Sequence, residues 1–597
     1  IKLIRNENGN GYTKAANMGL RASNADYCVL LNSDTIVTEN WLDKMIYCAK
    51  SDASIGIVGP LSNTASWQSV PQIFDEKGDW SHNKIPTDFT INEIGKIVEK
   101  TSAQLYKDVP LLNGFCLLIA RSTINRNGYL DETTFSQGFG EEDDYNLRAG
   151  KIGIKLAIAD DTYIFHAQSK SYSDAKRLEL CKNSGQKLRK KHGDILVNEA
   201  VFQMKESFIL QGIRNRIYYA IEKERLIKIA KRNWECKRVL IILPIADAGG
   251  GANVLLQESE KMIEMGVDVW IFNLSEFRTF FEASYPNLKV PIIYEDSLEK
   301  ITDYVNLFDA VCCTLYLSVK YLKPIEGSAY KKIYYIQDFE PYFFNENSYE
   351  YKEALESYKG LDKWVAVTKT QWNKKKVEQV SDICCNIIGP SVNLDLFRPR
   401  KMAVPREHVK ICAMVRPNSI RRAPKETMEI LRSISHKYLN QVDISIFGCD
   451  DMNSPGDREF MKNVCTDFKF TNWGKLTPEQ VAKLLSDNDI FVDFSSFQAM
   501  GLTAMEAMAC GCAVIVPENG GATSFAINNH NSLVVDTSDN EKCINALEQL
   551  IDDYELRKRL GWQAIQDICQ YYPEKAAFKF LKAVFGQEKY FDEIIRN

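Results

Sequence analysis

The stretch "FSSFQAMGLTAMEAMACGCAVIVPENGG", residues 494–521, joins the end of an apolar strand to a glycine loop and a helix. Gly501 in that loop allows backbone to approach a ligand closely. The helix then presents unpaired N–H groups, beginning at Leu502 and Thr503, and the positive end of its dipole to an anion such as a diphosphate. Glu506, in the same helix, is placed to accept hydrogen bonds from ribose hydroxyls. The alternative interpretation is an ordinary strand–loop–helix unit with Glu506 on a solvated face.

The composition of the whole chain is that of a globular protein of several domains. It has 597 residues, of which 45% are apolar and 26% are charged. The formal net charge of −5 gives no reason to expect nucleic acid as a partner. No apolar run approaches the ~18 residues that a membrane-spanning helix needs. We therefore expect a cytoplasmic protein that is at most peripheral at the inner face of a membrane.

Strand and helix patterns alternate over most of the chain, which predicts the α/β class. We expect five regions: an α/β domain, a basic helical linker, two further α/β domains of similar style, and a C-terminal helix that packs back on the first of those two. Their predicted bounds are 1–181, 182–236, 237–400, 401–575 and 576–597.

The stretch around Glu506 resembles the signature of glycosyltransferase family 4, in which two glutamates are separated by seven residues. Glu506 matches the second glutamate, and "EAMACGCAVIV" matches its surroundings. The first glutamate is replaced by Gln498, which can hydrogen-bond sugar hydroxyls but carries no charge to stabilise a developing oxocarbenium ion. The resemblance implies a GT-B fold, two Rossmann-like domains facing a cleft, and places Gln498 among the catalytic residues.

Further motifs fit the same resemblance in the expected order. In "AMVRPNSIRRAPKE", Arg416 and Arg421, with Arg422 beside them, match the basic residues that grip the donor diphosphate in the family. The glycines of "PIADAGGGANVL", 249–251, lie where an acceptor or phosphate would approach, although a tight turn is an equal alternative.

The motif "YYIQDFEPYFF" resembles a strand end seen in rhamnosyltransferase-like members of the family. Asp338 and Glu340 within it are candidates for acceptor contacts, or else loop carboxylates. The resemblance implies dTDP-rhamnose as donor and a GT-B module that needs no metal cofactor.

Near the start of the chain, "YCVLLNSDTIV" is an apolar strand that ends in Asn32-Ser33-Asp34. Carboxylates at the end of such a strand lie at the ligand edge of the sheet and can hold Mg²⁺ or Mn²⁺. The alternative is a capped turn before the next helix. The segment resembles glycosyltransferase family 2, of GT-A fold, in which this motif is the metal and nucleotide site. The same resemblance adds His166 as a third metal ligand beside Asn32 and Asp34.

The stretch "GEEDDYNLR" resembles the family's catalytic-base region. An inverting transfer needs one carboxylate to take the proton of the acceptor hydroxyl. The match places this base at Glu142, with Asp143 as its rival because the acids are doubled. Asn113 and Gly114, in "LLNGFCLLIA", resemble the segment beside the acceptor sugar, and apolar packing is the alternative.

The chain opens partway through this α/β pattern, so we expect a GT-A module that lacks its first, nucleobase-binding strands. Residues 182–238 carry 15 Lys and Arg against 6 Asp and Glu. This segment is either a surface for an anionic membrane or a helical linker packed on one domain.

Taken together, these motifs predict a two-module glycosyltransferase that moves a sugar, with rhamnose favoured, from a nucleotide-diphosphate donor to a cell-surface polysaccharide or lipid-linked glycan. The alternative is that only the GT-B half is catalytic and the GT-A half docks acceptor or binds glycan.

Overall fold

The computed structural model describes residues 4, 11–136, 139–168, 174–246, 249–326, 329–399, 408–464 and 467–586. The chain forms two compact units, Ile1–Ile221 and Glu222–Asn597. The predicted boundary at residues 400 and 401, and the end of the predicted C-terminal helix, residues 587–597, lie outside the described residues.

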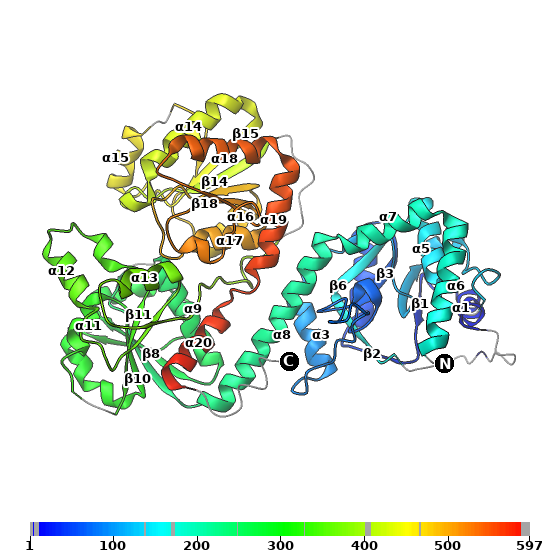
Figure 1. Cartoon of the computed structure of the whole chain (residues 1–597), viewed down its shortest axis with the longest axis horizontal. Helices are drawn as coiled ribbons and strands as arrows, with labels where there is room; N and C mark the ends of the chain where they lie inside the picture. The colour runs from blue at the N-terminus through cyan, green and yellow to red at the C-terminus, as the bar shows by residue number, and fades with distance from the viewer. Residues whose placement is uncertain are drawn as a thin grey trace. The chain divides into compact units, whose positions relative to one another are not determined.

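The first unit is built on a mixed six-stranded sheet with the order β1-β5-β3-β6-β2, and β4 pairs with β6 (Figure 1). β3 and β6 are parallel, whereas β1 and β2 are antiparallel to their partners β5 and β6. The strands are β1 Tyr27–Leu31, β2 Thr35–Val37, β3 Ile55–Leu61, β4 Asp108–Val109, β5 Cys116–Ala120 and β6 Lys155–His166. The helices before the connecting segment are α1 Tyr12–Ala22, α2 Trp41–Ser51, α3 Ile91–Thr101, α4 Arg121–Asn127 and α5 Glu141–Lys151.

Residues 174–234 form three helices, α6 Asp174–His192, α7 Asp194–Lys205 and α8 Phe208–Trp234. Leu188, Val197, Met204 and Ile213 from these helices join the hydrophobic core of the first unit. The guanidinium of Arg214 is buried there and donates to the carbonyl oxygens of Trp67 and Ser69. This basic segment is therefore helical, and much of it packs on the α/β domain that precedes it.

The N-terminal domain of the second unit has a fully parallel seven-stranded sheet with the order β13-β12-β11-β10-β7-β8-β9. The strands are β7 Arg238–Ile242, β8 Asp268–Leu274, β9 Ile292–Glu295, β10 Ala310–Cys313, β11 Lys331–Ile336, β12 Val365–Thr368 and β13 Cys385–Ile387. The helices are α9 Gly250–Glu264, α10 Arg278–Ser284, α11 Tyr316–Leu322, α12 Tyr349–Glu356 and α13 Gln371–Glu378. Strands β7 and β10 are apolar throughout their buried residues, as expected for a sheet covered on both faces.

The C-terminal domain of the second unit has a parallel six-stranded sheet with the order β16-β15-β14-β17-β18-β19. The strands are β14 Val409–Met414, β15 Val442–Phe447, β16 Thr471–Asn472, β17 Ile490–Val492, β18 Ala513–Pro517 and β19 Leu533–Val535. The helices are α14 Pro424–Tyr438, α15 Pro455–Asn463, α16 Pro478–Ser486, α17 Leu502–Cys510, α18 Asn540–Asp552 and α19 Tyr554–Ile568. The predicted α/β class with twin Rossmann-like domains is confirmed.

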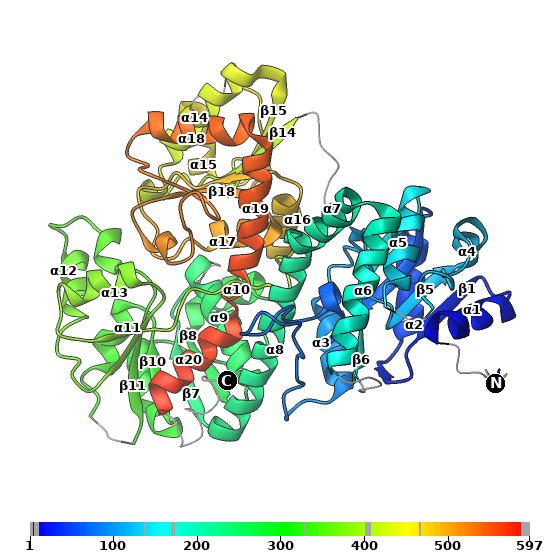
Figure 2. The ribbon, with the colours of Figure 1, turned by 45° about the vertical axis from the view of Figure 1, so that its right-hand side comes forward.

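The last described helix, α20 Pro573–Phe585, leaves the C-terminal domain and lies beside α9 in both views of the ribbon (Figures 1 and 2). Ala577, Phe578, Leu581 and Val584 on this helix join the apolar core around β7 and β8. α20 thereby ties the N-terminal domain to the chain that follows the C-terminal domain. None of the described helices combines the length and the hydrophobicity needed to cross a bilayer.

Candidate functional site

The strand order of each sheet in the second unit reverses direction once, and ligands of open α/β sheets bind at such points. In the N-terminal domain the reversal lies between β7 and β10, so the glycines after β7 lie at its mouth. In the C-terminal domain it lies between β14 and β17. The arginines of 416–422 follow β14, and residues 494–501 follow β17, so the topology brings these two predicted segments together.

A cavity of about 230 Å³ collects these residues from both domains. The predicted site residues in its lining are Gly250, Gly251, Asp338, Glu340, Arg421, Arg422, Gln498, Gly501 and Leu502. The lining does not include Gly249, Arg416, Thr503 or Glu506. Gly249 and Thr503 are next in sequence to lining residues. Arg416 and Glu506 interact electrostatically with the lining residues Arg421 and Arg422, respectively. Residues predicted from four separate stretches of sequence therefore meet in one cleft.

Arg421 makes an ion pair across this cleft with the carboxylate of Asp338, which follows β11 in the opposite domain. The guanidinium carbon of Arg421 also lies 5.0 Å from the ring centre of Phe343 and 5.7 Å from that of Phe497. Burial raises the pKa of Asp338, and Arg421 partly offsets this effect. A residue predicted to bind diphosphate and a residue predicted to contact acceptor are therefore paired with each other.

Glu506 lies close to two of the predicted diphosphate-binding arginines. Burial raises the pKa of its carboxyl to about 8, against the opposing effect of Arg416 and Arg422. Burial also lowers the pKa of Arg422 to about 10. A carboxyl with this pKa is largely protonated at neutral pH and can donate as well as accept a hydrogen bond.

The N-terminus of α17 has no side-chain cap, because Gly501 occupies the N-cap position in the left-handed region with φ 88°. Gln498, just before it, is 3% exposed, and its amide donates to the Ser495 hydroxyl at 2.7 Å. Its backbone runs against Gly520, where a Cβ would lie 2.4 Å from the Gln498 carbonyl oxygen. Only glycine fits at Gly520, so the "GG" of 520–521 holds this loop in position.

The helix α9 also begins without a side-chain cap, at Gly249. A Cβ on Gly251 would lie 2.4 Å from the side-chain oxygen of Gln337, which follows β11. The glycine run thus permits close approach of two cavity-lining segments and leaves the first-turn N–H groups of α9 facing the cleft.

Glu340 is more deeply engaged than the sequence suggests. It is 3% exposed, accepts a hydrogen bond from the Tyr316 backbone N–H at 3.0 Å, and accepts another from the Tyr334 hydroxyl at 3.3 Å. Burial raises its pKa to about 8. Its carboxylate therefore caps the start of α11, and its predicted acceptor contact stays a prediction.

Lys369 is a cavity-lining residue that the sequence analysis missed. It follows β12, is 2% exposed, and pairs with Glu258 of α9. The Glu258 carboxylate also accepts from the hydroxyls of Tyr335 at 2.7 Å and Ser391 at 2.6 Å. Burial lowers the pKa of Lys369, and Glu258 opposes that shift. The only local signal was a basic residue directly after the strand "VAVT".

In the first unit, the structure places Asp34 and His166 side by side, because Thr35 in β2 pairs with His166 in β6. His166 Nε2 lies 3.4 Å from Asp34 Oδ1. Nδ1 of the same ring lies 3.0 Å from the Thr64 carbonyl oxygen, which can only accept, so Nδ1 carries the proton. In the neutral ring Nε2 therefore directs a lone pair toward the carboxylate, an arrangement that a cation between the two groups would stabilise.

The segment Asn113–Phe115 links this pair to the acidic cluster of α5. The Phe115 ring stacks on His166 with 5.2 Å between ring centres, and the Phe115 carbonyl accepts from the Asn32 N–H at 2.9 Å. The backbone N–H of Gly114 bonds to Glu142, and a Cβ on Gly114 would lie 3.3 Å from Glu142 Cβ. The predicted metal, acceptor and base residues of the first unit therefore form one connected site.

The four acids that open α5 differ in their surroundings. Burial raises the pKa of Glu141 to about 9 and that of Asp143 to about 8, with Glu142 adding to both shifts, and burial also raises the pKa of Glu142 itself. Asp144 instead accepts from Arg148, Lys191 and His192, which together hold its pKa low against burial. Asp144 is thus a structural ion-pair centre, whereas burial raises the pKa of the other three carboxyls, so that Glu141 and Asp143 retain a proton near neutral pH.

The donor set for a metal in the first unit consists of Asp34 and His166, with Asn32 adjacent. In the part of the chain that the structure describes, no group of three or more His, Cys, Asp or Glu side chains is placed to hold a metal ion. Two protein ligands suit Mg²⁺ or Mn²⁺ when substrate phosphates supply the others. The residues present therefore fit the predicted Mg²⁺ or Mn²⁺ when the ion is also bound by substrate phosphates.

Comparison with known proteins finds a family match for two segments of the chain. Residues 1–122 match the family model described as glycosyl transferase family 2, and residues 460–567 match the model described as glycosyl transferases group 1. A D-inositol 3-phosphate glycosyltransferase of Corynebacterium diphtheriae is 23% identical over 221 residues, which are 34% of this chain and 51% of that protein.

A second relative is the N,N'-diacetylbacillosaminyl-diphospho-undecaprenol alpha-1,3-N-acetylgalactosaminyltransferase of Campylobacter jejuni. It is 28% identical over 137 residues, which are 22% of this chain and 35% of that protein. The chain thus spans about half the length of the first of these relatives and about a third of the second.

Among solved structures, Anabaena Alr3699/HepE in complex with UDP-glucose matches with a TM-score of 0.49 and 14% identity, covering 59% of this chain and 100% of that one. The expectation of two different glycosyltransferase modules on one chain is confirmed by the family models. The chain carries a glycosyltransferase family 2 segment over residues 1–122 and a glycosyl transferases group 1 segment over residues 460–567.

Proposed function

We propose that this chain is a glycosyltransferase that moves a sugar from a nucleotide-diphosphate donor onto a growing cell-surface polysaccharide. The observation that carries the proposal is the cavity at the two switch points of the second unit, where arginines and two uncapped helix N-termini converge. Groups of this kind neutralise a leaving diphosphate through hydrogen bonds and charge.

In the second unit, Arg421, Arg422 and the N-terminus of α17 bind the donor diphosphate, with Arg416 adjacent. Glu506 holds the ribose hydroxyls and Gln498 lies beside the transferred sugar. Because cations and helix dipoles already balance the diphosphate charge, this module works without a metal ion.

The donor sugar is proposed to be rhamnose, carried by dTDP. The support is the likeness of "YYIQDFEPYFF" to rhamnosyltransferase-like proteins. The acceptor is proposed to be a glycan, either free or linked to a lipid diphosphate, as the name of the Campylobacter relative states for that protein.

In the first unit, Asp34 and His166, with Asn32, would hold Mg²⁺ or Mn²⁺ against a donor diphosphate. Such an ion offsets the charge that develops on the leaving group. Glu142 or Asp143 takes the proton of the acceptor hydroxyl, and Asn113 and Gly114 flank the acceptor. The connection of these groups through Asn113–Phe115 supports a single reacting site.

A second candidate function is that only the second unit transfers sugar, while the first unit docks acceptor. The raised pKa of Asp143, about 8, favours this alternative, because a carboxyl that holds its proton cannot act as the base. Asp34→Asn and Glu506→Gln would separate the two readings, because loss of all transfer with Glu506→Gln alone supports the alternative.

A peripheral membrane contact through 182–238 is proposed from the surface of α7. Ile195 is 84% exposed and Phe202 is 64% exposed, and their spacing of seven residues places them on one face of the helix. Basic residues of α6, 189–191, lie at the adjoining helix end. Exposed apolar residues beside positive charge suit an anionic lipid surface.

Incubation of the full chain with labelled dTDP-rhamnose and an oligosaccharide acceptor tests the function. We expect release of nucleoside diphosphate and transfer of label. UDP-glucose and UDP-N-acetylglucosamine in parallel test the donor, and the absence of transfer or donor hydrolysis with all three would overturn the proposal.

A further inference from the structure

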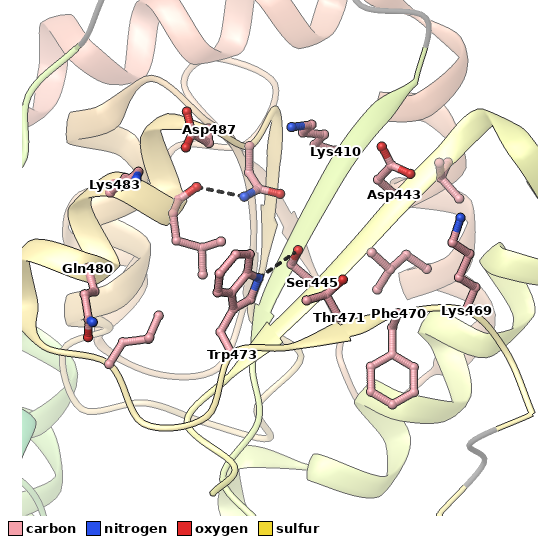
Figure 3. A pocket seen from close by; sticks show the side chains of 15 residues that line it. Lys410, Asp443, Ser445, Lys469, Phe470, Thr471, Trp473, Gln480, Lys483 and Asp487 are labelled. Atoms are coloured by element: carbon pink, nitrogen blue, oxygen red, sulfur yellow. Dashed lines mark hydrogen bonds between the residues drawn. The ribbon is translucent and has the colours of Figure 1, made fainter.

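A second cavity of about 580 Å³ lies in the C-terminal domain of the second unit and shares no lining residue with the cleft (Figure 3). It lies between α16 and the neighbouring strands β14, β15 and β16. We call it the Trp473 groove. The residues that line it are Lys410, Val442, Asp443, Ile444, Ser445, Lys469, Phe470, Thr471, Trp473, Leu476, Gln480, Lys483, Leu484, Asp487 and Asn488.

The groove lies over polar side chains on one face of these strands. In β15, Val442, Ile444 and Ile446 point into the apolar core, so Asp443 and Ser445 point to the opposite face. The strand register places Lys410 beside Asp443 and Thr471 beside Ser445. A parallel sheet is normally covered by apolar packing on both faces. Here the polar side chains leave this part of the face open.

Trp473 gives the groove an aromatic wall. It is 52% exposed, and its indole N–H donates to the Ser445 hydroxyl at 3.3 Å, which fixes the ring against the strand (Figure 3). Its backbone N–H continues the sheet by donating to the carbonyl oxygen of Ile446 at 2.9 Å. A tryptophan that is held in place yet left half-exposed offers a flat apolar face with a polar edge.

The remaining groove residues supply hydrogen bonds and a positive balance of charge. Lys410, Lys469 and Lys483 stand against Asp443 and Asp487, and Figure 3 shows all five around the cavity. Gln480 and Thr471, both exposed, add neutral donors and acceptors. An aromatic platform with many hydrogen-bonding groups suits a ligand that has both ring faces and hydroxyls, and the lysines favour one with negative charge.

We propose that the Trp473 groove binds a segment of an anionic oligosaccharide, with one ring stacked on Trp473 and its carboxylates or phosphates near the lysines. A volume of about 580 Å³ lies within the usual range of ligand sites. The inference rests on the proposed function in that the bound segment belongs to the acceptor glycan. The groove would hold this segment outside the cleft, raising the local concentration of acceptor ends.

Calorimetric titration of the full chain with an octamer of galacturonic acid, and with maltooctaose as its uncharged counterpart, tests the proposal. We expect the acidic octamer to bind more tightly and to weaken with added salt. We expect Trp473→Ala to reduce its affinity at least tenfold and Trp473→Phe to retain most of it. Phe280→Ala, which removes a ring that is 62% exposed on α10, is the matched control and leaves binding unchanged.

Lys483→Glu keeps the aromatic wall and is expected to remove the preference for the acidic octamer. This variant tests the groove even if Trp473→Ala misfolds. Absence of binding of both octamers to the wild-type chain would overturn the proposal. Equal affinity of Trp473→Ala and wild type for the acidic octamer would do the same. So would the finding that Trp473→Ala changes the oligomeric state of a chain that binds no glycan. UDP and dTDP titrations on the same samples separate the two proposals, because a chain that binds nucleotide but no octamer refutes only the groove.

Discussion

Arg421 and Asp338 form an ion pair that joins the two domains of the second unit across the cleft. Arg421 follows β14 in one domain, and Asp338 follows β11 in the other. A donor diphosphate at the cleft would compete with Asp338 for the guanidinium, because both are anions that suit its fork of N–H groups. The pair thus makes donor binding and the interdomain contact mutually dependent.

Replacing Asp338 by Asn should therefore strengthen nucleoside diphosphate binding. Hydrogen bonds to charged groups contribute about 1.5–3 kcal/mol, so we expect a gain of about tenfold or more. Calorimetry with UDP and dTDP measures it, and Arg421→Ala should weaken the same binding. If Asp338→Asn leaves nucleotide affinity unchanged and raises only the KM for acceptor, Asp338 acts through the acceptor.

The raised pKa of Glu506 predicts a pH-dependent stability. The pKa of Glu506 is about 8 in the folded chain and near 4.5 in the unfolded chain, so between these pH values only the folded chain keeps the proton. The contribution of Glu506 to the free energy of unfolding therefore falls as the pH rises from about 4.5 through 8. Glu506→Gln should melt close to wild type at pH 5 and a few degrees higher at pH 9. Glu518→Gln, at an exposed acid eight residues past α17, is the control. Equal melting temperatures of Glu506→Gln and wild type at both pH values would refute the shift.

Asp34 and His166 should bind a divalent cation in the first unit. Loss of one ligand usually weakens a metal site by tenfold or more, so Asp34→Asn and His166→Ala should each weaken Mn²⁺ binding at least tenfold. Titration of the chain with Mn²⁺, in which electron paramagnetic resonance measures the free ion, gives the affinity without an activity assay. Asp43→Asn, on the exposed surface of α2, should leave it unchanged. Wild-type binding in Asp34→Asn would exclude the site.

The acids of α5 should reveal which carboxylate is the base. General-base catalysis contributes about 10²–10⁴-fold, so one of Glu142→Gln and Asp143→Asn should lower kcat of the first module by that factor. Because the base must be ionised, a base at Asp143 should give a rate that rises with pH through about 8. A rate that is flat from pH 6 to 9 would argue against Asp143.

Lys369 should prove essential to the second unit through its pairing with Glu258. Lys369→Met leaves a buried carboxylate without its counter-ion, which typically costs about 3–5 kcal/mol in unfolding free energy. The double variant Lys369→Met/Glu258→Gln should recover part of that loss. Denaturant unfolding measures both. If the double variant recovers stability but not nucleotide binding, Lys369 also contacts the donor.

Much of the candidate site could be predicted from the sequence because its parts are local. A glycine before a helix, arginines after a strand and an Asn-Ser-Asp at a strand end each report backbone geometry within a few residues. Gly501 and Asp34 were identified in this way, and Arg421 through its resemblance to glycosyltransferase family 4. Lys369 was not, because a single lysine after a strand resembles any surface lysine until its partner, 111 residues earlier, is known.

The Trp473 groove shows the same limit in another form. Its polar face depends on β15 lying between β14 and β16, an order that the chain reaches only through crossovers. Alternation within β15 could be read from "VDISIF", but the groove between α16 and the side chains of Asp443 and Ser445 could not.

The sequence by itself determined the α/β class, the two glycosyltransferase motif sets and the residues at the strand ends, because periodicity and turn chemistry are short-range properties. Only the tertiary structure decided which of those residues face one another: Arg421 with Asp338, Asp34 with His166, and Trp473 with Ser445. These pairings depend on strand order and on the packing of segments 28 to 132 residues apart, and no local pattern encodes that information.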